Sequence, residues 1–82
     1  MKIIGLDEHR TLAGNGALKY FELERMPSDD WGRLFESRFH DQEVKVWIEG
    51  YCIVLQCNTD EIEKYREFLQ VKCDETTAQL IA

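Results

Sequence analysis

The clearest pattern in the chain is an alternation of apolar and polar residues over positions 43–57, interrupted once at Glu49-Gly50. Alternation with a period of two is typical of strands, and a glycine between two such runs is typical of a hairpin turn. With a two-residue turn at Glu49-Gly50, one face would pair only apolar residues: Ile48 with Tyr51, Val46 with Ile53, and Val44 with Leu55. We therefore expect this face to lie in the core.

Two earlier segments, residues 2–7 and 17–25, are also predicted to be strands because they are short and contain β-branched or aromatic residues. In the second segment Phe21 and Leu23 share one face. Its other face carries Leu18, Tyr20 and Glu22. The link between the two segments contains Asn15-Gly16, a pair that suits turn positions with positive φ. A hairpin turn and a longer loop fit this link equally well.

Two later segments are predicted to be amphipathic helices. Ser28 can cap the first, and the two aspartates that follow it suit the positive end of a helix dipole. Apolar residues then recur at spacings of three and four over about three turns: Trp31, Leu34, Phe35 and Phe39. The second helix begins near Asn58 and Glu61, which have the spacing of a capping box. Its apolar stripe continues for up to about five turns: Ile62, Tyr65, Leu69, Cys73, Thr76 and Leu80.

These elements predict one domain, residues 1–82, with the order β-β-α-β-β-α. Each helix has one apolar stripe, and the last hairpin has one apolar face, so both helices are expected on the same side of the sheet. The expected fold class is α+β, a two-layer sandwich with two helices on one face of an antiparallel sheet. The sheet has four strands if residues 2–7 form a strand, and three if they do not.

Such a fold leaves the second face of the sheet without helices. Five residues on that face are the candidate interface: Trp47, Cys52, Val54, Tyr20 and Leu18. Trp47 is the most informative, because tryptophan is costly to leave in water and is enriched in the cores of interfaces. An alternative is that residues 8–16 or the C-terminal tail fold over Trp47 and cover it.

One set of motifs carries a resemblance. The strand ending in Phe21-Glu22-Leu23-Glu24, then Pro27 and Trp31, the hairpin, and Thr59-Asp60-Glu61-Ile62-Glu63 resemble small bacterial proteins of unassigned function. The resemblance covers roughly residues 17–77. It implies the order of the elements and a bacterial or phage origin, and it implies no activity.

Composition and charge disfavour several kinds of partner. The 82 residues include 10 Lys and Arg against 16 Asp and Glu, so the net charge is −6. This balance disfavours nucleic acid and anionic membranes as partners. A hydrophobic content of 44% disfavours a disordered acidic tail. The chain has neither a signal-peptide pattern nor a run of roughly 18 apolar residues, so the expected location is the cytoplasm.

Residues that could carry chemistry are few. The chain has three cysteines: Cys52, Cys57 and Cys73. They form no C-x-x-C pair, so reduced thiols are expected, and Cys52 and Cys57 are expected on opposite faces of one strand. The two histidines, His9 and His40, are expected in exposed loops. The glycines beside Asn15 lack the spacing of a phosphate loop. We therefore expect no enzyme activity, no metal and no cofactor.

The favoured hypothesis is a non-enzymatic protein-interaction module, most simply a homodimer with two sheets packed face to face around Trp47. The alternative is an acidic regulator or inhibitor that binds a basic, nucleic-acid-binding protein. The net charge and the acid-rich segment 60–75 suggest that alternative. A small enzyme or ligand carrier would need a pocket, and no group of polar residues points to one.

Overall fold

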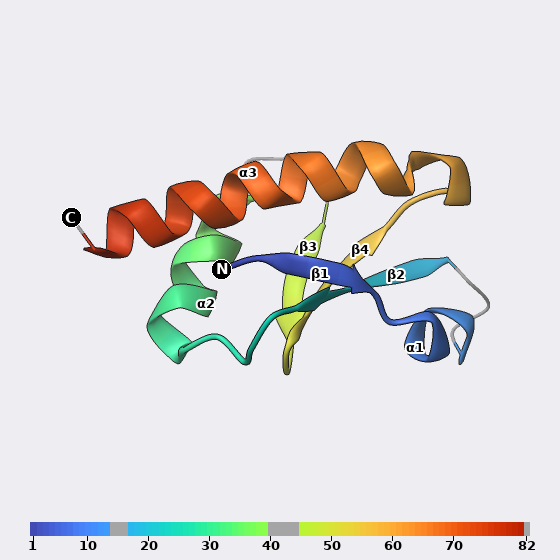
Figure 1. Ribbon diagram of the computed structural model, residues 1–82, viewed down its shortest axis with the longest axis horizontal. Coiled ribbons are helices and arrows are strands. Elements are labelled where there is room, and N and C mark those ends of the chain that lie inside the picture. Colours follow the sequence, from blue (N-terminus) through green and yellow to red (C-terminus); the bar gives the residue numbers. More distant parts are fainter. Residues whose placement is uncertain (14–16, 40–44, 82) are drawn as a thin grey trace.

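The computed structural model describes residues 1–13, 17–39 and 45–81. In chain order the elements are β1 (Ile3–Leu6), α1 (Glu8–Ala13), β2 (Leu18–Leu23), α2 (Asp29–Ser37), β3 (Val46–Glu49), β4 (Cys52–Gln56), a 3-10 turn at Thr59–Glu61 and α3 (Ile62–Ile81). The four described strands form one antiparallel sheet in the order β1-β2-β4-β3. The long helix α3 lies along the sheet, and α2 lies beside it (Figure 1). The predicted α+β fold is therefore confirmed, with four strands.

The link between the first two strands differs from the prediction, because it contains the short helix α1. Asp7 starts this helix: the backbone N–H of Arg10 donates to Asp7 Oδ1 at 3.2 Å, and that of Thr11 donates to the Asp7 carbonyl at 3.1 Å. The buried Thr11 hydroxyl accepts from the backbone N–H of Tyr20 at 3.1 Å. This bond ties α1 to β2. The predicted turn at Asn15-Gly16 lies outside the described residues.

The second hairpin has the predicted faces but a different turn. Its two turn residues are Gly50 and Tyr51, rather than Glu49 and Gly50. Gly50 has a φ of 60°, which suits the first central position of a type II′ turn. The register therefore shifts by two residues: Ile48 pairs with Ile53, and Val46 pairs with Leu55. A shift of two keeps Val46, Ile48, Ile53 and Leu55 on their predicted face. The predicted pairing of Ile48 with Tyr51 is wrong, because Tyr51 lies in the turn and its ring contacts Arg10. The expected partner Val44 lies outside the described residues.

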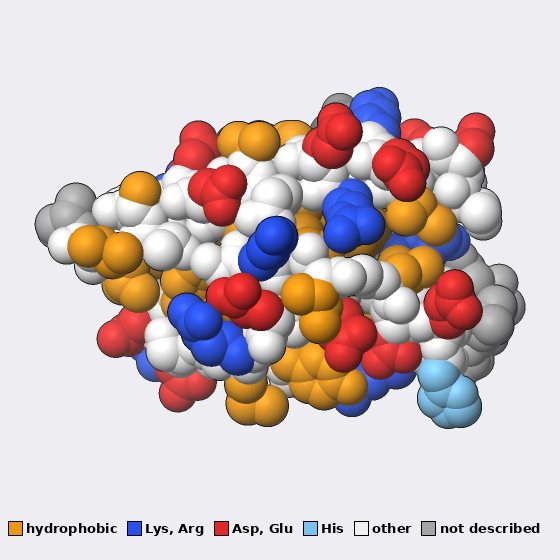
Figure 2. Space-filling view, viewed as in Figure 1, with side chains coloured by type: hydrophobic (Ala, Val, Ile, Leu, Met, Phe, Trp, Pro, Cys, Tyr) orange, Lys and Arg blue, Asp and Glu red, His pale blue; other side chains and the backbone are white. Residues whose placement is uncertain are grey.

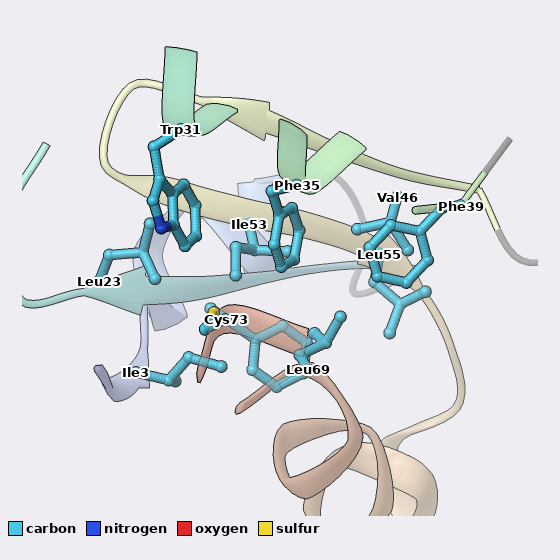
Figure 3. Close-up of a cluster of buried hydrophobic side chains, with 11 residues drawn as sticks. Ile3, Leu23, Trp31, Phe35, Phe39, Val46, Ile53, Leu55, Leu69 and Cys73 are labelled. Atoms are coloured by element: carbon cyan, nitrogen blue, oxygen red, sulfur yellow. The ribbon is translucent and has the colours of Figure 1, made fainter. Parts of the chain in front are cut away.

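The core lies between the sheet and the two longer helices, with side chains of α2 and α3 meeting those of the strands (Figure 3). Its buried residues are Ile3, Phe21, Leu23, Trp31, Phe35, Phe39, Val46, Ile53, Leu55, Leu69 and Cys73. Residues four apart on a helix lie on the same face. Accordingly the rings of Trp31 and Phe35 stack with centroids 5.1 Å apart, and Phe35 and Phe39 are 5.1 Å apart. Full burial of each such side chain stabilises the fold by about 1.5–3 kcal/mol.

Both predicted helix caps are confirmed. The Ser28 hydroxyl accepts from the backbone N–H of Trp31 at 3.2 Å. At the start of the last helix the capping box is present, and the backbone N–H of Asn58 donates to Glu61 Oε1 at 3.1 Å. In both cases a side-chain oxygen accepts a hydrogen bond from a backbone N–H near the start of the helix. The first backbone N–H groups of a helix have no acceptor within the helix itself.

The apolar stripe of α3 is shorter than predicted. Leu69, Cys73 and Thr76 are buried, but Leu80 is 47% exposed. Figure 1 shows the C-terminal turns of α3 extending beyond the end of the sheet, where the helix has no strand to pack against. None of the helices in the described part of the chain has the length and apolar character needed to cross a membrane.

Candidate functional site

The candidate site is the outer face of the sheet, which is the face turned away from α2 and α3. Strand register places its side chains in rows that cross the sheet. Tyr20 and Trp47 both lie opposite Val54, so these three residues form the middle row. One neighbouring row is formed by Glu22, Cys52 and Glu49, and Leu18 pairs with Gln56 on the other side. All five predicted interface residues therefore share one face.

Two of the predicted interface residues are not available to a partner. Cys52 and Val54 are both 0% exposed in the single chain. They belong to β4, an inner strand of the sheet, and larger side chains stand on both sides of them. Trp47, Tyr20 and Leu18 are half-buried, and they contribute the apolar surface of this face. The candidate interface is correspondingly smaller than the sequence suggested.

Helix α1 covers one end of the outer face through Arg10. The Arg10 guanidinium carbon lies 5.9 Å from the ring centroid of Tyr20 and 5.4 Å from that of Tyr51. These distances are typical of cation–π contacts. Arg10 Nε also lies 3.7 Å from Asp7 Oδ2. Thus the described part of residues 8–16 covers the Tyr20 side of the face, whereas the C-terminal helix lies on the opposite side of the sheet.

Acidic groups gather at the same end of the face. Burial raises the pKa of the Cys52 thiol; Arg10 lowers it, and Asp7, Glu22 and Glu49 raise it further. This thiol is therefore protonated at neutral pH and is a poor nucleophile. Partial burial and a hydrogen bond to Glu49 raise the pKa of the Tyr20 phenol. The phenol is therefore protonated at neutral pH.

The other end of the face carries a positive charge. Lys45 directly precedes β3 and is exposed. Because side chains alternate along an extended chain, Lys45 is expected on the same face as Trp47, two residues further on. The outer face therefore has an aromatic middle row and a basic end at Lys45. Its acidic end carries Glu22 and Glu49, with Asp7 and the Arg10 guanidinium nearby.

The other chemistry-bearing residues lie apart from one another. His9 is exposed on α1, rather than in a loop, and His40 lies outside the described residues. Cys57 packs against the core whereas Cys52 lies on the outer face, so their predicted opposite orientation is confirmed. Burial raises the pKa of Cys73 to about 12. Among residues 1–13, 17–39 and 45–81, no group of three or more His, Cys, Asp and Glu side chains could hold a metal ion.

Two open grooves lie elsewhere on the molecule. One of about 560 Å³ follows β1 and α3 and is lined mainly by polar and charged side chains, among them Glu63, Arg66 and Gln70. The other, of about 410 Å³, lies at the C-terminal end of α3, where Met26 and Ile81 are 66% and 80% exposed. Figure 2 shows apolar side chains gathered at that end. Neither groove is lined by histidine or cysteine.

Arg10 and Lys19 were not predicted from the sequence as part of any site, and Tyr51 was predicted on the core face opposite Ile48. Arg10 contacts tyrosines that are distant in sequence, and such contacts leave no spacing pattern. The Asp7 cap three residues before Arg10 was the available signal for α1. Lys19 alternates with Phe21 and Leu23 on the core side and is only 3% exposed. The alternation with Phe21 and Leu23 implies this position, but lysine is almost never buried to this degree, so the residue type argued against it.

No protein-family model matches the chain, and no curated protein and no solved structure matches it either.

Proposed function

We propose that this chain is a non-enzymatic protein-interaction module that forms a homodimer through the outer face of its sheet, around Trp47. The observation that carries the proposal is the middle row, in which Tyr20 and Trp47 lie on opposite sides of the buried Val54. Aromatic side chains are the residues most enriched in the energetic centres of interfaces. A second copy would cover Trp47 and the part of Tyr20 that Arg10 leaves exposed.

The charges of the face favour a second copy as the occupant. In face-to-face packing, a two-fold axis running along the middle row would set Trp47 of one copy against Trp47 of the other. The same axis reverses the strand direction, so Lys45 of each copy would meet the acidic end of the other, at Glu49. The basic end of each copy therefore faces the acidic end of the other copy. Groups of the same charge do not face each other in this arrangement.

The size of the face predicts a weak dimer. Four strands about 4.8 Å apart and about 17 Å long give a sheet face of only a few hundred Å². A standard interface buries about 800 Å² on each partner, so the dimer belongs to the small, reversible class. We expect a dissociation constant in the micromolar range or weaker, and an oligomeric state that depends on concentration.

The test is the mass of the wild-type chain and of two variants, measured by light scattering over a range of concentrations. Trp47→Ala should weaken the dimer at least about tenfold, because it removes the centre of the interface. Val71→Ala is the matched control, since Val71 is 55% exposed on α3 and lies away from the outer face. Circular dichroism checks that both variants fold. Equal dissociation constants for folded Trp47→Ala and wild type would end the proposal.

An acidic regulator of a basic, nucleic-acid-binding protein has less support. The acid-rich helix α3 also carries Lys64, Arg66 and Lys72, and Lys72 Nζ lies 3.3 Å from Glu75 Oε1. Mixed charges of this kind are typical of a solvated helix surface. Salt-sensitive binding to a basic protein partner would favour this second function over the homodimer.

A further inference from the structure

The strand β1 lies at one edge of the sheet. On the side away from β2, backbone groups at this edge form hydrogen bonds with a side chain of α3. The backbone N–H of Ile3 donates to Gln70 Oε1 at 2.9 Å, and Gln70 Nε2 donates to the Met1 carbonyl at 3.1 Å. One side-chain amide thus supplies the acceptor and the donor that the peptide groups of a neighbouring strand would supply. Exposed edges without such partners are templates for pairing with another chain.

Neighbouring side chains hold this amide in place. Gln70 Nε2 also donates to Asp74 Oδ1 at 2.9 Å, one helical turn further along α3. Arg66, one turn earlier, places its guanidinium 3.5 Å from the Ile3 carbonyl oxygen. These residues line the 560 Å³ groove along β1. The pairing of β1 with β2 is also irregular between Ile3 and Gly5, and such bulges discourage pairing at an edge.

The opposite edge of the sheet has a similar contact. The backbone N–H of Ile48 in β3 donates to Glu36 Oε2 at 3.0 Å, and Glu36 belongs to α2. Each of the two helices therefore extends a polar side chain to the edge strand nearest to it. The same kind of contact is thus made by two different helices at two different edge strands. We infer a common role for both, which is to hydrogen-bond backbone groups of the edge strands that could otherwise pair with another chain.

We propose that Gln70 closes the β1 edge against strand addition by a second copy of this chain. Without its amide, the Ile3 N–H and the Met1 carbonyl lose their partners, and the edge can pair with the β1 of another copy in antiparallel orientation. The adjacent Ile4 is 54% exposed and would add apolar contact to such a pair. Gln70 thereby restricts self-association to surfaces other than this edge.

The experiment uses Gln70→Met and Gln70→Ala, each made in the Trp47→Ala chain so that association through the outer face does not contribute. Methionine keeps the length and helix propensity of glutamine but removes both hydrogen-bonding groups, so it decides the result if the alanine variant does not fold. Gln79→Met is the control, because Gln79 also lies on α3 but accepts from Arg38 rather than from β1.

Two measurements follow. In dilute protein, amide exchange at Ile3 should be about tenfold faster in the Gln70 variants than in the control, because a hydrogen bond is lost. In concentrated protein the Gln70 variants should form dimers or larger species by light scattering, with Ile3 protected again, while the control keeps the mass of its parent. Gln70→Met with the mass and the Ile3 exchange of the control would overturn the proposal.

Discussion

Tyr20 and Trp47 lie on opposite sides of Val54 on the outer face of the sheet, one from β2 and the other from β3. This arrangement buries Val54 completely while both rings stay half-exposed. A ring that shields an apolar neighbour on one side and remains wet on the other gains further burial when a partner docks. The proposed homodimer depends on this gain and on the charges at the two ends of the face.

The charges at the two ends of the outer face predict that exchanging the residues at positions 45 and 49 partly restores a dimer weakened by a change at position 45 alone. Lys45→Glu should weaken the dimer by a few-fold, since an exposed ion pair contributes about 0.2–1 kcal/mol. Adding Glu49→Lys to the same chain should recover part of the loss, because the proposed two-fold axis brings these positions together between copies. The dissociation constants are measured at low and at high salt, where the difference between variants should shrink. A double variant no tighter than Lys45→Glu at low salt would contradict this orientation.

Two glycines should respond to alanine with opposite signs. Gly50 has a φ of 60°, so Gly50→Ala should destabilise the fold by about 1–2 kcal/mol. Gly32 lies inside α2, and a Cβ there would meet no atom within 4 Å. Gly32→Ala should therefore stabilise the fold by up to about 1 kcal/mol. Urea unfolding measures both, and a stable Gly50→Ala variant would exclude the Gly50-Tyr51 turn.

Stability should fall in alkaline solution because of Cys73. Burial raises the pKa of this thiol from 9.0 to about 12 in the folded chain. The stabilising effect of the neutral buried thiol is complete below pH 9, and it is lost as the pH rises toward 12, since the unfolded chain ionises first. The free energy of unfolding is measured from pH 7 to 11 for wild type and Cys73→Ala.

The two curves should converge and then cross within this pH range, because ionisation of Cys73 costs wild type more by pH 11 than the alanine substitution costs at pH 7. At pH 7, Cys73→Ala should be about 1 kcal/mol less stable, a typical cost for a core substitution. The Cys57→Ala variant serves as the comparison, because Cys57 is only half-buried. Parallel curves for wild type and Cys73→Ala would show that Cys73 does not titrate in this way.

The hairpin shows which features of the fold could be predicted from the sequence. The alternation of apolar residues assigns Val46, Ile48, Ile53 and Leu55 to one face, and the structure confirms that face. The alternation does not distinguish two pairing registers that differ by two residues, because such a shift moves no strand side chain to the other face. The turn at Gly50-Tyr51 thus depends on which central position the glycine takes, and the pattern contains no information on that choice.

The candidate site was predictable in its position but not in its exposure. The side-chain alternation that places Trp47, Val54 and Tyr20 on one face can be seen in the sequence. Val54 and Cys52 are completely buried between the side chains of neighbouring strands, and Arg10 of α1 lies over Tyr20. Those contacts join residues far apart in the chain, and only the strand order brings them together.

The most direct test of the central claim is a series of amide NMR spectra of the wild-type chain at increasing concentration. The proposed dimer predicts shifts that grow with concentration at residues of the outer face, centred on Tyr20, Trp47 and Val54, and no shifts in the C-terminal turns of α3. Spectra that stay unchanged up to the highest concentration, or that change only around Met26, Leu80 and Ile81, would contradict it.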